Sequence, residues 1–282
     1  MERRAEVPVR VRDGFPLVPA TVGATPVTLL LDTGAQGMLV TPEAAAALGL
    51  PPDPGVTTRM FGTGGFRDVP NVVLQNLRLG GALVPAHSTP VAALPGVPTT
   101  EPPLAGLLGA PLLAAYDLDL DVPGGRMTLY ESNGCGATPP PIPGPVTTLP
   151  LEVTPAGEAF LPVRINGETL LALLDTGSRA TLLTTDAARR LGLAGPVSAN
   201  TARGVDNAAM PLSHHRVREM RVGEDVVPNA PVSVAPLQLG RGDMLLGLDY
   251  LGRRRVWVSY RTGRVVIGLR PDAPASPAPS PQ

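Results

Sequence analysis

The chain has 282 residues, of which 23 are basic and 24 acidic, giving a formal net charge of −1. A balance this close to neutral, with no basic stripe along the chain, argues against a nucleic-acid partner. The single cysteine, Cys135, excludes an intrachain disulfide framework. The spacing of the cysteine and of the three histidines, His87, His214 and His215, is not that of a metal site. We therefore expect no metal and no cofactor.

The first residues, MERRAEVPVRVRDG, contain arginines but no apolar segment that would form a secretory signal. We therefore expect either a protein that stays inside the cell or one whose leader has been removed. No apolar stretch reaches the ~20 residues that a membrane-spanning helix needs, so we also expect no membrane span.

The next segment predicts two strands and a short helix around an aspartate. LVPATVGATPVTLLLD predicts two strands that turn at Gly23, and the second strand ends at Asp32. TPEAAAALGL then predicts a helix with Thr41 as its N-cap. An ionised carboxylate placed directly after three leucines is costly to bury without partners, so Asp32 needs a structural or chemical reason.

Farther along, LAGLLGAPLLAAYDLDLDVPGGRMTLY predicts an apolar pair followed by Gly109, a brief helix, and a hairpin that turns within residues 123–125. The proline-dense segment CGATPPPIPGPVTT follows. Because proline removes a sheet hydrogen bond, this segment predicts a linker between two units rather than a strand.

The second half of the chain repeats the first. LLDTGAQGMLVTPEAAAALGL recurs without a gap as LLDTGSRATLLTTDAARRLGL, 143 residues later, so that Asp175 corresponds to Asp32. The strands before Asp175 turn at the dipeptide Asn166-Gly167, a strong hairpin signal. The later apolar pair with its glycine recurs at Gly247.

We therefore expect an all-β fold of two similar lobes related by a pseudo-twofold axis. A short helix would follow each Asp-Thr-Gly loop and each Leu-Leu-Gly segment. The predicted divisions are an N-terminal lobe over residues 1–134, a linker over 135–148, a C-terminal lobe over 149–270, and a disordered Pro/Ala/Ser tail over 271–282.

Two lobes with one aspartate each can place two carboxyl groups face to face. Carboxyl groups within about 3 Å of each other cannot both ionise, so they share a proton. The ionised partner can take a proton from a bound water while the protonated partner donates to a substrate carbonyl. This chemistry hydrolyses an amide without a covalent enzyme intermediate, and it predicts that Asp32 and Asp175 are catalytic.

The loop residues that follow the aspartates are predicted to support them: Thr33, Gly34, Ala35, Thr176, Gly177 and Ser178. We expect the glycines to let the backbone turn sharply and bring amide donors to the carboxylates, and the threonine hydroxyls to hydrogen-bond across the lobe interface. We also expect the hydroxyl of Ser178 to donate to the neighbouring carboxylate, which would make Asp175 the more easily ionised member of the pair.

The sequence resembles the pepsin and retropepsin superfamily of aspartic peptidases, and more closely the bacterial retropepsin-like members. The resemblance lies in the segments LLLDTGA and LALLDTGS and in the later Leu-Leu-Gly of each half. The resemblance covers nearly all of residues 15–270. It implies acid-protease β-barrel lobes, an aspartic-type endopeptidase, and packing of Gly109 and Gly247 under the aspartates. Relatives of this type are often exported to the periplasm. The resemblance therefore implies a periplasmic location, with the cytoplasm as the alternative.

The resemblance also implies a flap, a hairpin that closes over bound peptide. RMFGTGGFRDV, residues 59–69, is similar to the glycine-rich flap of retroviral proteases. Its expected substrate-facing residues are Phe61, Gly62, Gly64, Gly65 and Phe66. In the second half TARGVDNAAM retains only Gly204, so we expect the flap of the first lobe to cover the substrate.

The leading hypothesis is a hydrolase that cleaves a peptide or protein substrate in a cleft between the two lobes of one chain. An alternative from another class is a catalytically silent peptide-binding module with the same fold. We expect a monomer with an internal pseudo-dimer, although the length of the linker leaves a domain-swapped dimer open.

Overall fold

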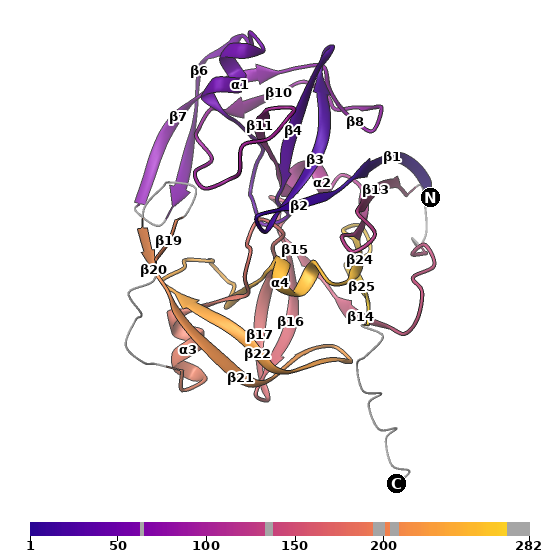
Figure 1. The fold of residues 1–282 in the computed structure, drawn as a ribbon, viewed down its shortest axis with the longest axis vertical. Helices are drawn as coiled ribbons and strands as arrows, with labels where there is room; N and C mark the ends of the chain where they lie inside the picture. The colour runs from indigo at the N-terminus through magenta and orange to yellow at the C-terminus, as the bar shows by residue number, and fades with distance from the viewer. Residues whose placement is uncertain (63–64, 133–137, 194–200, 204–208, 270–282) are drawn as a thin grey trace.

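The computed structural model describes residues 1–62, 65–132, 138–193, 201–203 and 209–269. These residues form mostly β structure, with the two halves of the chain in the upper and lower parts of Figure 1. The predicted all-β, two-lobe fold class is confirmed. None of the helices in the described part of the chain has the length and hydrophobicity of a membrane span.

The first lobe is built around the hairpin that leads to Asp32. β3 (Phe15–Val22) and β4 (Thr25–Leu31) turn at Gly23, whose φ is +59°. β4 runs parallel to β11 (Leu104–Leu108). The same sheet also contains β2 (Arg10–Arg12), β5 (Leu39–Val40), β8 (Leu77–Leu79) and β9 (Ala82–Leu83). A separate sheet contains β6 (Pro52–Gly62), β7 (Gly65–Leu74) and β10 (His87–Pro90).

The second lobe repeats this plan around Asp175. β16 (Ala159–Ile165) and β17 (Glu168–Leu174) turn at Asn166 and Gly167, whose positive φ angles of 52° and 95° confirm the predicted turn. β17 runs parallel to β23 (Met244–Leu246), and a pairing of β16 with β21 closes the sheet on itself. Its other strands are β15 (Glu152–Val153), β18 (Leu182–Thr184), β21 (Ser213–Val222) and β22 (Asp225–Ala235). β19 (Thr201–Arg203) and β20 (Ala209–Pro211) form a separate pair.

A six-stranded sheet joins the two halves of the chain. Its strand order is symmetric, because the hairpins β12–β13 and β24–β25 meet through an antiparallel pairing of β12 with β24. β1 and β14 form its two edges. Figure 1 shows most of its strands in a column between the upper and lower halves. The bounds are β1 (Glu2–Pro8), β12 (Asp117–Asp121), β13 (Arg126–Glu131), β14 (Val146–Pro150), β24 (Arg255–Ser259) and β25 (Arg264–Gly268).

The predicted short helices form after the Asp-Thr-Gly loops and the Leu-Leu-Gly segments. α1 (Pro42–Ala47) and α3 (Thr185–Arg190) begin after Thr41 and Thr184, whose hydroxyl groups accept hydrogen bonds from backbone amides in the first turn. α2 (Ala110–Leu113) and α4 (Leu248–Leu251) begin directly after Gly109 and Gly247.

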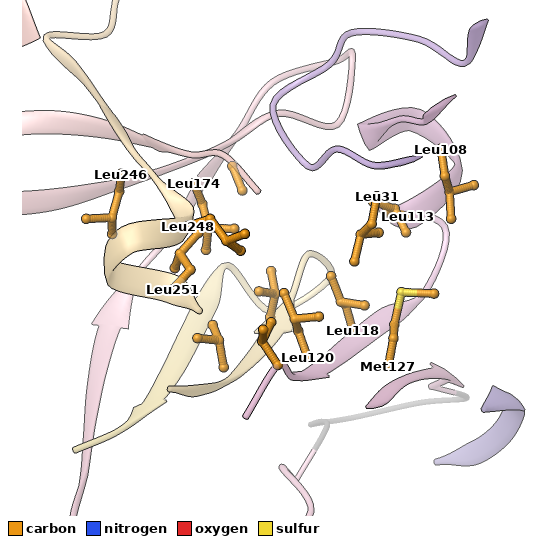
Figure 2. Close-up of a cluster of buried hydrophobic side chains, with 14 of the residues drawn as sticks. Leu31, Leu108, Leu113, Leu118, Leu120, Met127, Leu174, Leu246, Leu248 and Leu251 are labelled. Carbon is orange, nitrogen blue, oxygen red and sulfur yellow. The ribbon is translucent and has the colours of Figure 1, made fainter. Parts of the chain in front are cut away.

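One hydrophobic core runs through both lobes. Leu31 and Leu174, the residues before the two aspartates, are fully buried in it. Figure 2 shows Leu118 and Leu120 of the six-stranded sheet between the side chains of the first lobe and those of the second. The last residues of β4 and β17 are therefore fixed by a shared apolar core, which gives the two aspartates a common support.

The last residues of the predicted linker, 135–148, belong to a strand. β14 begins at Val146, so residues 146–148 of the predicted linker are paired with β25. This stretch contains no proline and keeps its amide donors, which explains why it can pair. Cys135 and the tail over 271–282 lie outside the described residues, and the predicted lobe boundaries remain a proposal.

Candidate active site

The two aspartates follow the ends of equivalent strands. The backbone amide of Asp32 donates to the carbonyl of Leu108 at 3.0 Å, and that of Asp175 donates to the carbonyl of Leu246 at 3.1 Å. Both acceptors are the second leucine of a Leu-Leu-Gly segment. Each aspartate is therefore held at the point where its strand leaves the parallel pairing.

This geometry brings the side chains of Asp32 and Asp175 together. Their carboxyl groups hydrogen-bond to each other, although the residues lie 143 positions apart in the sequence. Asp32 also accepts from the amides of Gly34 and Ala35 at 3.1 and 3.0 Å. Asp175 accepts from the matching amides of Gly177 and Ser178 at 2.9 and 3.1 Å. Each loop thus supplies two amide donors to its own carboxyl group.

Gly34 and Gly177 are required for a reason that the sequence did not show. Neither has a positive φ, so the expected sharp turn is not what demands glycine. A Cβ atom on Gly34 would lie 2.5 Å from Cγ of Asp175, and one on Gly177 would lie 2.4 Å from Cγ of Asp32. Each glycine therefore leaves room for the carboxyl group of the opposite lobe.

Thr33 and Thr176 lock the two loops together. The hydroxyl of Thr33 donates to the carbonyl of Leu174 at 2.7 Å and accepts from the amide of Thr176 at 3.0 Å. The hydroxyl of Thr176 donates to the carbonyl of Leu31 at 2.8 Å and accepts from the amide of Thr33 at 3.1 Å. Both side chains are fully buried. The four bonds fix the spacing of the aspartates, since every one of them crosses between the lobes.

Gly109 and Gly247 lie directly against the aspartate loops. A Cβ atom on Gly109 would sit 1.9 Å from the carbonyl oxygen of Gly37, and one on Gly247 would sit 2.4 Å from that of Ala180. The residue after each glycine donates its amide to the loop, from Ala110 to Ala35 and from Leu248 to Ser178. Both glycines thus pack against the loops that follow the aspartates.

Burial raises the pKa of both carboxyl groups. It raises the pKa of Asp32, and it raises the pKa of Asp175 well above its usual value, with the charge of Asp32 as a second cause. Asp175 is only 9% exposed, whereas Asp32 is partly exposed. Because burial and the neighbouring charge both disfavour a second ionisation, the pair retains one proton between its two carboxyl groups.

The expected effect of Ser178 is wrong. Its hydroxyl donates to the carbonyl of Ala180 at 2.7 Å, and only its backbone amide reaches Asp175. The corresponding Ala35 amide gives Asp32 an equivalent bond. Because the two loops supply similar amides, burial is the clearest difference between the surroundings of the two carboxyl groups.

The predicted flap is a hairpin of β6 and β7. In its ladder Phe61 and Gly62 pair with Phe66 and Gly65, while Gly64 lies outside the described residues. Phe66 is 63% exposed. The guanidinium of Arg59 lies 4.4 Å from the centre of the Phe66 ring.

The second half also has a hairpin at this position, formed by β19 and β20. Gly204 lies outside the described residues. Figure 1 shows the pair β19–β20 on the same side of the molecule as the lower ends of β6 and β7.

Sequence reasoning missed two equivalent apolar clusters on the face of the strands before Asp32 and Asp175 that points away from the main core. β4 sends Leu29 and Leu31 into the main core but Leu30 into a second cluster, since side chains alternate along a strand. The first-lobe cluster consists of Leu17, Leu30, Leu39, Val69, Ala92 and Leu107, with Phe15, Ala35 and Met60 among its partly buried neighbours. The second-lobe cluster consists of Phe160, Leu173, Leu182 and Leu245, with Ala180 and Leu212 among its neighbours. The 143-residue offset relates Leu17, Leu30 and Leu39 to Phe160, Leu173 and Leu182, so the repeat itself carried this signal.

Comparison with known proteins shows the family to which the chain belongs. A family profile described as "Aspartyl protease" matches residues 18–112 and 161–250, which together make up more than half of the chain. The chain is also similar to "DNA damage-inducible protein 1" of Yarrowia lipolytica, with 30% identity over 112 residues. That match covers 39% of this chain and 27% of the relative, so the chain spans only a minor part of the relative's length.

Proposed function

Because the chain belongs to the aspartyl protease family, we propose that it is an aspartic endopeptidase whose catalytic residues are Asp32 and Asp175. The observation that carries this proposal is the hydrogen-bonded pair of carboxyl groups, each held by two amides. The burial that keeps one proton on the pair supports a division of roles, with Asp32 as base and Asp175 as acid.

In the proposed reaction, a water molecule attacks the carbonyl carbon of the scissile peptide bond. Asp32 takes a proton from the water, and Asp175 gives its proton to the carbonyl oxygen. The tetrahedral intermediate then collapses as Asp32 passes its proton to the leaving nitrogen and Asp175 recovers one from a hydroxyl group. The products are a carboxylic acid and an amine, and the enzyme returns to its starting state without a covalent intermediate.

The supporting residues have a positioning role in this proposal. Thr33 and Thr176 fix the separation of the carboxyl groups, and Gly109 and Gly247 allow the later glycine segments to pack against the loops. This rigidity matters because acid–base transfer requires the reacting atoms to be aligned before reaction.

An extended peptide would lie between the two lobes, with its scissile bond at the carboxyl pair. Partly buried apolar residues of the two clusters would receive its side chains, namely Phe15, Ala35, Met60, Leu171, Ala180 and Leu212. We propose that the hairpin β6–β7 covers the peptide, because Met60 and Val69 of this hairpin pack on the same cluster as Ala35 of the catalytic loop.

The alternative is a silent peptide-binding module. A cleavage assay with a peptide library, run from acidic to neutral pH, separates the two. The endopeptidase predicts products from the wild type and a loss of ~10³-fold or more in Asp32→Asn and Asp175→Asn. Asp186→Asn is the matched control, because this aspartate is 78% exposed on α3. Binding of labelled peptides without products at any pH would instead identify the silent module.

The same preparation tests the proposed assembly. We propose a monomer whose two lobes, divided near residues 134 and 149, form one site. A mass in solution equal to one chain is expected, and cleavage activity should not depend on protein concentration. A mass of two chains would instead indicate that lobes are exchanged between copies.

A further inference from the structure

Two contacts made by the loops that follow the aspartates differ in charge, at positions that the repeat makes equivalent. Gln36 and Arg179 each lie four residues after a catalytic aspartate, and each extends to the opposite lobe. Nε2 of Gln36 donates to Oε1 of Glu158 at 3.0 Å. The guanidinium of Arg179 lies 5.3 Å from the centre of the Phe15 ring. Since Phe15 and Glu158 are also related by the 143-residue offset, these are two versions of one contact.

The Arg179 version presents a positive charge. Arg179 is exposed, and among the residues that the structure describes it forms no ion pair. Its aliphatic stem lies over Gly14, where a Cβ atom would be 2.9 Å from Cδ of Arg179. The ring of Phe15 holds the guanidinium by a cation–π contact, which leaves the N–H groups at its edge for a carboxylate ligand.

The Glu158 version presents a negative charge. Its two carboxylate oxygens accept from the Gln36 amide and from the hydroxyl of Thr154, at 3.0 and 3.1 Å. Both donors are neutral, and within the described ranges no cation lies within ion-pair distance of Glu158. The carboxylate is therefore oriented but not neutralised.

The pseudo-twofold axis that exchanges Asp32 and Asp175 also exchanges these two contacts. They lie on opposite sides of the carboxyl pair, and a peptide whose scissile bond sits at the pair extends past it in both directions. We propose that the two contacts make the site selective for charge: the substrate carries an acidic residue on the Arg179 side of the scissile bond and a basic residue on the Glu158 side. This inference rests on the proposed function for the location of the substrate.

The test uses a neutral peptide that the enzyme cleaves, resynthesised with Glu, Gln or Lys at each position on either side of the bond. At low salt the wild type should cleave the best Glu peptide about fivefold faster, by kcat/KM, than the matching Gln peptide. A Lys preference of similar size should occur on the other side. Both preferences should fall as ionic strength rises from about 20 mM to about 500 mM, because salt screens exposed charges.

Three variants assign the preferences to residues. Arg179→Gln introduces the residue of the equivalent position and should bring the Glu-to-Gln ratio to about one while leaving the Lys preference in place. Glu158→Gln should do the reverse. Arg78→Gln is the control, because this exposed arginine on β8 hydrogen-bonds only to the carbonyl of Gly81 among the described residues and should keep both wild-type ratios.

The outcomes separate this inference from the proposed function. Cleavage without charge preference, or a Glu preference that survives in Arg179→Gln, would overturn the inference alone. If no peptide is cleaved, the proposed function fails, and fluorescence anisotropy with the same labelled peptides decides the inference. Tighter binding of the Glu peptide that is lost in Arg179→Gln would support it, and equal binding of the three peptides would overturn it.

Discussion

Gly34 faces the carboxyl group of Asp175 at so short a distance that a methyl group on its Cα would lie 2.5 Å from Cγ of that aspartate. Gly177 has the same relationship to Asp32, at 2.4 Å. Each loop therefore depends on a residue whose steric partner belongs to the other half of the chain. The consequences can be measured, because the chain also contains a loop glycine without such a neighbour.

Replacing Gly34 or Gly177 by alanine should push the carboxyl groups apart. We expect kcat/KM to fall by ~100-fold or more, since a displacement of about 1 Å is enough to disturb proton transfer. Gly37→Ala is the matched control, because a Cβ atom at Gly37 meets nothing within 4 Å and its φ is not positive. Equal losses in Gly37→Ala and Gly34→Ala would show that loop flexibility, not the opposite carboxyl group, requires the glycine.

Asp175→Asn should change the pH dependence of stability. The pKa of Asp175 is raised well above 3.8 in the folded protein. The stability linked to its protonated form is therefore fully present below the unfolded pKa and is lost as pH rises toward the folded value. Asparagine remains uncharged, so the decline in the free energy of unfolding above about pH 4 should be shallower in Asp175→Asn. Urea denaturation across this range measures the slope.

Asp32→Asn provides the comparison for this measurement. It removes the charge that helps to raise the pKa of Asp175, so the slope in Asp32→Asn should also be shallower than in the wild type. A slope in Asp32→Asn equal to that of the wild type would show that the two carboxyl groups do not interact.

Ser178→Ala should leave both limbs of the pH–rate profile where they are, within about 0.3 pH unit. The Ser178 hydroxyl donates to the carbonyl of Ala180, and the backbone amide that reaches Asp175 is retained in alanine. The absolute rate should fall modestly because the loop loses one hydrogen bond. A shift of the acidic limb to higher pH would show that the hydroxyl interacts with the carboxyl group after all.

Thr33→Val should destabilise the protein by about 2–4 kcal/mol, because it leaves the carbonyl of Leu174 and the amide of Thr176 buried without a partner. Thr33→Ser keeps the hydroxyl and should cost about 1 kcal/mol. Denaturant unfolding of both variants gives these values. Similar losses in the serine and valine variants would mean that the methyl group, not the hydrogen bonds, holds the loops.

A double-mutant cycle tests whether the threonines act as one unit. Thr33 and Thr176 donate and accept reciprocally, so the loss in the double valine variant should be smaller than the sum of the single losses by about 1–3 kcal/mol. Additive losses would indicate that each hydroxyl serves only its own loop.

Much of the fold could be predicted because its signals are local. The turn at Asn166-Gly167 and the N-caps Thr41 and Thr184 depend on residues within a few positions of each other. The 143-residue repeat then identified Asp32 and Asp175 as equivalent. The end of the proline-dense segment was less accurate, since β14 begins at Val146. Strand ends depend on the partner strand, which lies at the far end of the chain.

The sequence by itself thus determined that two equal units exist and that each delivers one carboxyl group at the end of a buried strand. Only the tertiary structure decided what distinguishes the two units. It buries Asp175 more deeply than Asp32, and it sets Arg179 on Phe15 but Gln36 against Glu158. The physical reason is that near-identical local sequences fold alike, whereas burial and charge depend on residues that the opposite lobe contributes.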